Sequence, residues 1–266
     1  LGTFGGWALM KLLRLSKLNA IYNRTKKFEG IDFLNKLLDE FEIKFEIPEE
    51  DFKNIPKEGA FITISNHPLG GVDGILLLKL LLEKRPDFKI MANFLLQRIE
   101  PLAPYVLPVN PFEDRKDAKS SIVGFKHTIA HLKEGKPLGL FPAGEVSVTK
   151  EGQLMVDKPW EEAAMKLTKK AKVPIVPIYF HAKNSKLFYF LDTLRTAKLP
   201  SELLTQKQRT IYIRIGKPIS VAMQDEHTDL ADFTEFLRKK TYILANAFEQ
   251  DKKFLPLPNV LKSNKG

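Results

Sequence analysis

Short β-rich runs alternate with helix-like stretches along the chain from about residue 60 onward. Turn-forming residues bound the runs, whereas the stretches between them carry apolar residues at steps of three and four positions. Because alternating strands and helices bury their apolar faces against one another in layers, this pattern predicts one α/β domain with a mixed central sheet flanked by helices. We expect strands at residues 60–65, 88–93, 105–110, 137–141, 173–180 and 209–216, and helices at 73–84, 117–134, 160–172 and 229–250.

Two prolines, Pro174 and Pro177, fall within one of the expected strands. Proline has no N–H to donate to a neighbouring strand, and it is therefore found mainly at sheet edges and at bulges. The sequence thus predicts an edge or a bulged position for the strand at 173–180.

Two amphipathic helices are expected ahead of the sheet. The first lies near the start of the chain, and Lys11 and Lys17 interrupt its apolar positions at helical spacing. The second covers residues 31–42, where apolar residues recur at three- and four-residue steps. We expect these helices to form a membrane-facing hairpin over residues 1–45, ahead of the α/β domain at 46–266.

The chain carries an excess of positive charge, with 42 Lys and Arg against 32 Asp and Glu among its 266 residues. Nucleic acid, an anionic membrane surface or a phosphate-bearing ligand can each account for such an excess. The sequence has no zinc-finger spacing, no aromatic RNP run and no basic helix with base-reading residues, so we expect no nucleic-acid partner. It also has no Cys, which excludes disulfides and thiolate metal sites.

No apolar run in the sequence reaches the roughly 18 to 20 residues that a membrane-spanning helix needs. In the first helix the positive charges lie inside and after the apolar stretch, whereas a signal peptide carries them before it. We therefore expect this helix to lie in the interface of an anionic membrane, at the cytoplasmic face of the inner membrane. Packing of the helix against its own domain is the alternative.

The segment with the most specific chemistry is Ser65-Asn-His-Pro-Leu-Gly-Gly-Val-Asp-Gly74. It follows an expected strand and opens a helix, at the sheet edge where open α/β folds bind ligands. The Gly-Gly turn allows His67 and Asp73 to meet, and such a pair can act as a general base in which the carboxylate fixes the imidazole tautomer. The alternative is a simple strand-to-helix turn, with Asp73 as the N-cap and His67 on the surface.

Four segments, in this order, resemble the motifs of the glycerolipid acyltransferase family, the lysophospholipid acyltransferases with an N-H-x4-D signature. Asn66-His67 with Asp73 resembles the first motif. Asn110-Pro-Phe-Glu-Asp-Arg115 resembles the second motif, Phe141-Pro-Ala-Gly-Glu-Val-Ser147 the third (F-P-E-G-T-R-S), and Val173-Pro-Ile-Val-Pro-Ile178 the fourth.

The resemblance implies that His67 takes a proton from the hydroxyl of a lyso-lipid acceptor while Asp73 holds the imidazole. The acceptor oxygen then attacks the thioester of an acyl carrier protein or of coenzyme A, and backbone N–H groups near Gly144 are candidates to hold the oxyanion. The resemblance implies no metal and no bound cofactor. The residues to which it assigns substrate binding are Asn66, Arg115, Gly144, Glu145 and Lys158.

Two departures from the family pattern bear on the catalytic pair and on the expected substrate. His67 and Asp73 lie six positions apart instead of the usual five, so we expect the extra glycine of the Gly-Gly pair to loop out and restore their contact. In the third motif Ala143 replaces the usual Glu, for which Glu145 is the candidate substitute. Val146 replaces the usual Arg, and valine cannot form the bidentate hydrogen bonds with which arginine binds a phosphate.

The missing arginine predicts an acceptor that is not a simple phosphomonoester. A lyso-aminolipid fits, meaning an N-acylated ornithine or glycine with a free 3-hydroxyl on its acyl chain. A lysophospholipid stays the alternative, because Arg115 and several lysines can contact phosphate. A catalytically inactive lipid-binding protein on the same scaffold is a further alternative, whereas a hydrolase with Ser65 or Ser147 as nucleophile is disfavoured by the absence of a G-x-S-x-G motif.

Overall fold

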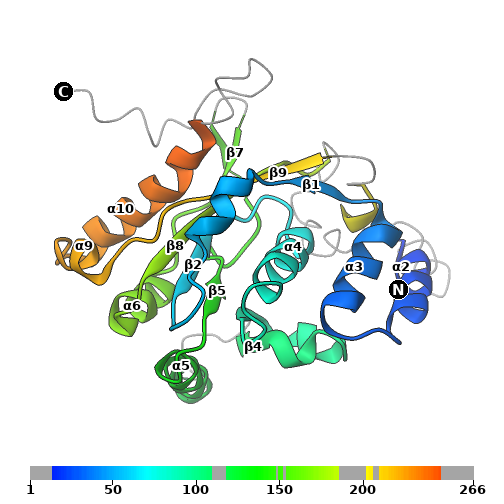
Figure 1. Cartoon of the computed structure of the whole chain (residues 1–266), viewed down its shortest axis with the longest axis horizontal. Helices are drawn as coiled ribbons and strands as arrows, with labels where there is room; N and C mark the ends of the chain where they lie inside the picture. The colour runs from blue at the N-terminus through cyan, green and yellow to red at the C-terminus, as the bar shows by residue number, and fades with distance from the viewer. Residues whose placement is uncertain are drawn as a thin grey trace, which may run out of the picture.

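The computed structural model has a seven-stranded sheet at its centre, with the strand order β1-β9-β8-β2-β5-β3-β4 (Figure 1). The structure describes residues 14–109, 118–147, 149–151, 154–185, 202–205 and 210–246. The strands of the sheet are β1 (Lys44–Glu46), β2 (Ile62–Ser65), β3 (Lys89–Asn93), β4 (Val106–Val109), β5 (Leu138–Leu140), β8 (Ile175–His181) and β9 (Thr210–Ile215). A separate antiparallel hairpin pairs β6 (Thr149–Glu151) with β7 (Leu154–Val156).

Five neighbouring strands of the sheet, β8, β2, β5, β3 and β4, run parallel to one another. Strand β9 runs antiparallel to β8, and β1 pairs parallel with β9. The sheet is therefore mixed, as expected. The carboxyl ends of the five parallel strands meet at one edge of the sheet, which is where a ligand site is favoured.

Helices cover both faces of the sheet (Figure 1). On one face, α3 and α4 pack with alternate residues of β8, among them Ile178 and Phe180. On the other face, α6 and α10 pack with alternate residues of β2, Ile62 and Ile64. The helices are α2 (Leu15–Thr25), α3 (Gly30–Phe41), α4 (Gly71–Leu82), α5 (Ala118–Lys133), α6 (Glu162–Ala171), α9 (Val221–Asp225) and α10 (Leu230–Tyr242), with 3-10 turns η1 (Glu49–Asn54), η2 (Phe94–Arg98), η3 (Ala103–Tyr105), η4 (Leu203–Thr205) and η5 (Ile243–Ala245).

Every strand and helix expected from residue 60 onward is present, and the α/β class is confirmed. Most ends agree to within two residues, but the last helix ends at Tyr242 and continues as the 3-10 turn η5. Strand β1 and the hairpin β6–β7 were not expected. Each of these strands has only three residues, which is too short for a pattern of period two to stand out.

The expectation that the proline-containing strand lies at an edge was wrong. Its pairing is irregular beside Pro177, however, because Ile178 pairs with Ile215 but Ile175 pairs with Ile219, which places one extra residue opposite β8. Strand β8 lies inside the sheet, between β2 and β9, and Pro174 precedes its first residue. The carbonyl of Pro177 accepts a hydrogen bond from the N–H of Gly216 at 2.8 Å, just after β9 ends. Because the N–H and C=O of a strand residue point the same way, the missing donor of Pro177 faces the end of β9 and leaves the pairing with β2 intact.

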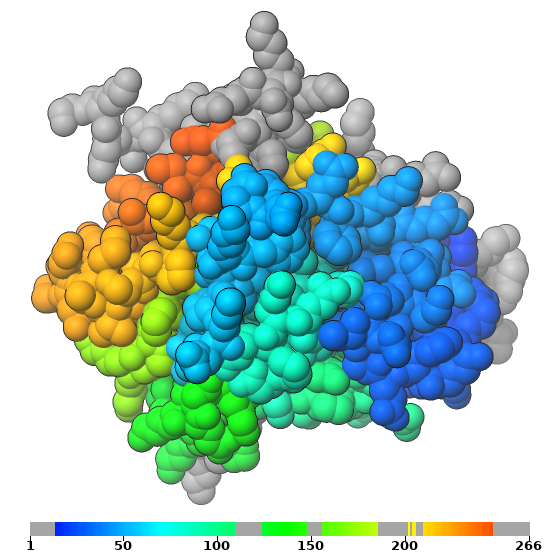
Figure 2. All heavy atoms as spheres, in the orientation of Figure 1, coloured from blue at the N-terminus to red at the C-terminus, as the bar shows by residue number. Residues whose placement is uncertain are grey.

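Helices α2 and α3 pack against each other and against the sheet domain. Arg24 of α2 and Glu40 of α3 form an ion pair at 2.6 Å, and the buried face of α3, including Phe33 and Leu34, belongs to the apolar cluster that contains α4. Figure 2 shows these two helices in blue at one end of this face of the molecule, with α10 in orange at the other. Residues 1–13 lie outside the described residues, and the division of the chain at residue 45 stays a prediction. None of the helices in the described ranges is long and apolar enough to cross a membrane.

Gly139 in β5 gives a direct test of the packing between the sheet and α4. A Cβ atom at this position would lie 2.7 Å from the ring of Phe88 and 3.0 Å from Leu77 Cδ2. We expect Gly139→Ala to lower the free energy of unfolding by about 1–3 kcal/mol in urea denaturation, because the added methyl group would overlap buried side chains that must shift to accept it. Gly124→Ala in α5 is the control, since its Cβ would make an ordinary contact and alanine favours helix. Equal stability of the two variants would contradict the packing.

Candidate active site

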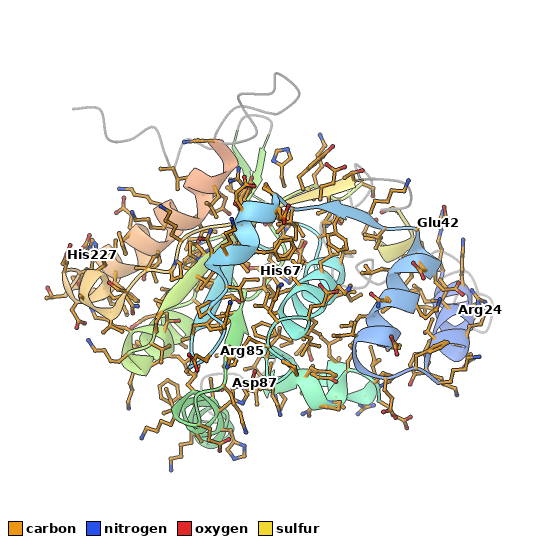
Figure 3. All side chains as sticks on the ribbon, viewed as in Figure 1. Arg24, Glu42, His67, Arg85, Asp87 and His227 are labelled. Atoms are coloured by element: carbon orange, nitrogen blue, oxygen red, sulfur yellow. The ribbon has the colours of Figure 1, made fainter. Side chains whose placement is uncertain are left out.

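The site is built where three parallel strands end side by side. Strand β2 leads into Asn66 and His67, β5 leads into Phe141, and β8 ends at His181. β2 pairs with β5 on one side and with β8 on the other, so these three ends lie at the same edge of the sheet. Figure 3 shows His67 near the middle of the molecule, beside α4.

The Gly-Gly turn brings His67 and Asp73 into contact. Gly70 has a φ of 72° and a ψ of −120°, a backbone conformation that side-chain-bearing residues rarely adopt. This turn starts α4, and Asp73 lies at the third helical position, with Gly70 as the N-cap. The His67 Nδ1 to Asp73 Oδ2 distance is 3.1 Å. The extra glycine therefore accommodates the longer spacing, as expected, and Asp73 is not the N-cap.

Asp73 is a fully buried carboxylate with an uneven set of partners. Its Oδ2 accepts hydrogen bonds from the N–H groups of Leu69 at 2.7 Å and Gly70 at 3.1 Å, in addition to the His67 contact. Its Oδ1 is buried and has no hydrogen-bond partner among the described residues. Burial raises the pKa of the Asp73 carboxyl above its ordinary value, although the contacts with His67 and the two N–H groups lower it in part.

This arrangement fixes the proton on one nitrogen of the imidazole. An ionised carboxylate has only acceptors, so the contact with Asp73 requires that Nδ1 of His67 carries the proton. Nε2 of the neutral ring is then a free base. The ring of Phe141 stacks on the imidazole, with 4.1 Å between ring centroids and 29° between planes, and the His67 side chain remains 18% exposed. His67 can therefore accept a proton from a molecule that reaches this edge of the sheet.

Asn66 ties the ends of two strands together. Its side-chain Nδ2 donates to the carbonyl of Phe180 at 2.9 Å, and the N–H of Phe180 donates to Asn66 Oδ1 at 2.7 Å. Asn66 is buried. These bonds hold the peptide that precedes His67, whereas a direct contact between Asn66 and a substrate stays a prediction.

The third-motif loop presents one exposed ion pair beside the site. Glu145 and Lys158 lie 2.7 Å apart, and their side chains are 51% and 47% exposed. Ala143 and Val146, the two departures from the family motif, are buried instead. Gly144 has a φ of 67°, and its own N–H donates to the carbonyl of Phe141 at 3.0 Å. The part of Gly144, Glu145 and Lys158 in substrate binding stays a prediction.

One candidate substrate-binding residue is not described by the structure, and one histidine of α5 makes a structural contact. Arg115, in the second motif, lies outside the described residues. His131 donates a hydrogen bond of 3.0 Å from its Nε2 to the carbonyl of Pro137, which is a structural contact. Within the described parts of the chain, no group of three His, Cys, Asp or Glu side chains could hold a metal ion.

Asp157 is the residue of this site that the sequence did not reveal. It lies between β7 and α6, is buried, and accepts a hydrogen bond from the N–H of His67 at 3.1 Å. It also accepts from the hydroxyl of Ser147 at 2.5 Å, so that serine is engaged in a buried hydrogen bond. No sequence signal could have identified Asp157, because its partners His67, Arg238 and Tyr242 come from distant parts of the chain.

The raised pKa of Asp73 predicts the sign of its effect on stability. The stability that this group contributes is fully present below the ordinary carboxyl pKa, about 3.9, and is lost as pH rises through the raised value. We therefore expect Asp73→Asn to raise the free energy of unfolding near neutral pH, where wild type must bury a charge, and to weaken its pH dependence. Urea denaturation between about pH 4 and pH 8 measures this. Asp232→Asn is the control, since Asp232 contacts His227 at 2.6 Å on the surface; a destabilised Asp73→Asn would contradict the expectation.

Comparisons with known proteins agree with this fold. Residues 5–251 match the family model described as Acyltransferase. Lyso-glycine lipid O-acyltransferase from Bacteroides thetaiotaomicron is 29% identical over 248 residues, covering 89% of this chain and 88% of the relative. The protein of the same name from Phocaeicola vulgatus is 28% identical over 247 residues, covering 89% and 86%.

Among solved structures, the 1-acyl-sn-glycerophosphate (LPA) acyltransferase PlsC from Thermotoga maritima has a similar fold. It superposes with a TM-score of 0.52 at 16% identity, covering 95% of this chain and 90% of that one. The shared fold and the family model, which spans nearly the whole chain, lead to one conclusion: the chain belongs to the acyltransferase family and is an acyltransferase.

Proposed function

We propose that the chain moves a fatty acyl group from a thioester donor to the hydroxyl of a lyso-lipid, with His67 as the general base and Asp73 as its orienting partner. The observation that carries this proposal is the 3.1 Å contact between His67 Nδ1 and the buried Asp73 carboxylate at the carboxyl edge of the sheet. The names of the two relatives, both lyso-glycine lipid O-acyltransferases, support the same class of acceptor.

In the proposed mechanism, Nε2 of His67 takes the proton of the acceptor hydroxyl as its oxygen attacks the thioester carbonyl. The new C–O bond forms and the carbonyl oxygen becomes an oxyanion, for which backbone N–H groups near Gly144 are the candidate donors. The C–S bond then breaks, and the leaving thiolate takes the proton from Nε2 of His67. The sequence of steps regenerates the neutral imidazole and needs no metal or bound cofactor.

Asp73 has a defined task in this scheme. When His67 gains the proton, a positive imidazolium faces a carboxylate that is shielded from water. The attraction between the two charges offsets part of the cost of burying Asp73, and it does so when the proton is transferred. An unpaired buried carboxylate is high in free energy. Its presence therefore stabilises the protonated His67 that forms during the reaction.

For the acceptor we favour a lyso-aminolipid over a lysophosphatidic acid. Val146 occupies the position of the family's arginine, and its side chain is buried, so it offers no contact to a phosphate. Lys158, which follows β7 and forms an exposed ion pair with Glu145 of the same loop, can exchange that partner for a single carboxylate such as that of an N-acylated glycine. A lysophospholipid is the second candidate, because Arg115 is still available in the sequence.

We further propose that the protein works at an anionic membrane surface, on the cytoplasmic side, with an acyl carrier protein or coenzyme A thioester as donor. The net charge of +10 and the exposed lysines of α2 and the turn after it, among them Lys17 and Lys26, support this location. Leu15 of the same helix is exposed as well, which adds an apolar contact for the interface.

The direct test is acyl transfer from labelled acyl carrier protein and acyl-CoA to a panel of lysophospholipids and lyso-aminolipids. We expect His67→Ala to lower the rate by roughly two to four orders of magnitude, as loss of a general base does. His227→Ala is the matched control, because His227 also contacts an aspartate, Asp232 at 2.6 Å, but lies at the edge of the molecule (Figure 3).

Each outcome of this test decides one part of the proposal. Full activity of His67→Ala would overturn the general-base role. A rate on lysophosphatidic acid equal to or above that on lyso-aminolipids would overturn the preferred acceptor. Lipid binding without turnover for any donor and acceptor would favour an inactive scaffold.

A further inference from the structure

The buried carboxylate of Asp157 connects three separate parts of the site. Its Oδ1 accepts hydrogen bonds from the N–H of His67 at 3.1 Å and the hydroxyl of Ser147 at 2.5 Å. Its Oδ2 accepts from the indole N–H of Trp160 at 3.2 Å. At 1% exposure, Asp157 is shielded from water. Three donors thus converge on one carboxylate, which no motif in the sequence marks.

The His67 residue is held on both sides of its main chain by this cluster. Its N–H donates to Asp157, and its carbonyl accepts a 2.9 Å hydrogen bond from the N–H of Ser147. Ser147 in turn donates its hydroxyl to the same carboxylate oxygen. The backbone of His67 is therefore fixed relative to the third-motif loop, independently of the contact that its imidazole makes with Asp73.

Two residues of α10 form hydrogen bonds with the main chain of Asp157. The N–H of Asp157 donates to the hydroxyl oxygen of Tyr242 at 2.9 Å, and its carbonyl accepts from Arg238 at 2.7 Å. Tyr242 is fully buried. The main chain of Asp157 is thus bonded to α10, and its side chain is bonded to His67, Ser147 and Trp160. Asp157 therefore connects α10 rigidly to the end of β2.

We propose that Asp157 is a positioning residue that sets the direction in which Nε2 of His67 points, an inference that rests on the proposed function of His67. The physical reason is that proton transfer requires close alignment of the reacting groups, so a small rotation of the His67 backbone lowers the rate without changing substrate affinity. Asp73 fixes the tautomer of the ring, and Asp157 fixes the backbone that carries the ring.

The chemistry of the cluster requires a carboxylate. Donors approach both oxygens of Asp157, and an asparagine has one acceptor and one donor end. In Asp157→Asn, whichever way the amide turns, its NH2 group faces a donor, either the indole N–H of Trp160 or the N–H of His67. Replacing Trp160 by Phe removes the donor at Oδ2, so that the amide oxygen can face His67 and Ser147.

This conflict gives an experiment that separates positioning from general damage. In the acyl-transfer assay we expect Asp157→Asn to lower kcat by roughly 10- to 100-fold, with the KM of the acceptor unchanged within about twofold. The double variant Asp157→Asn with Trp160→Phe is expected to recover a large part of that loss, although it removes one more hydrogen bond. Asp232→Asn, at the exposed contact with His227, is the unchanged control.

Thermal unfolding of each variant shows whether it folds. If Asp157→Asn does not fold, Ser147→Ala decides the question, because it removes the 2.5 Å bond to the same oxygen and should lower kcat several-fold at constant KM. An unchanged kcat in a folded Asp157→Asn, or no recovery in the double variant, would overturn the inference. Neither result bears on the general-base role of His67, which the activity of His67→Ala tests separately.

Discussion

The burial of the Asp73 carboxylate at the start of α4 is the constraint on which the site depends. Removing a charge from water is costly, and the fold offsets part of that cost with the N–H groups of Leu69 and Gly70 and with the imidazole of His67. All three contacts use the same oxygen, Oδ2. The unusual conformation of the turn at Gly70 brings both N–H groups and the imidazole to this one atom.

Buried hydrogen bonds hold the main chain of His67, on the side of the residue away from Asp73. Parallel strands β2, β5 and β8 bring the three loops to one edge, and Asp157 joins two of them to α10 through buried hydrogen bonds. Asn66 joins the ends of β2 and β8 in the same way. His67 is thus positioned by its neighbours on every side, while its ring remains partly exposed to the substrate.

Much of the fold and half of the site were predictable from the sequence, for local reasons. Periodicity identified each long strand and helix, and the contact between His67 and Asp73 follows from the short glycine turn between them. Strand β1 was missed because three residues carry no periodic signal. The interior position of Pro177 depends on where β9 ends. The role of Asp157 depends on residues up to 90 positions away. A local sequence pattern therefore predicts neither of them.

The tautomer of His67 tests the central claim most directly. Nitrogen NMR of histidine-labelled protein, assigned with the His67→Ala variant, reports which ring nitrogen carries the proton in the neutral imidazole. We predict a protonated Nδ1 and an unprotonated Nε2 in wild type, and the loss of this preference in Asp73→Ala, which removes the acceptor at Oδ2. A proton on Nε2 in the wild-type protein would contradict the proposed role of the buried carboxylate, because the ring would then present a donor instead of a base to the acceptor hydroxyl.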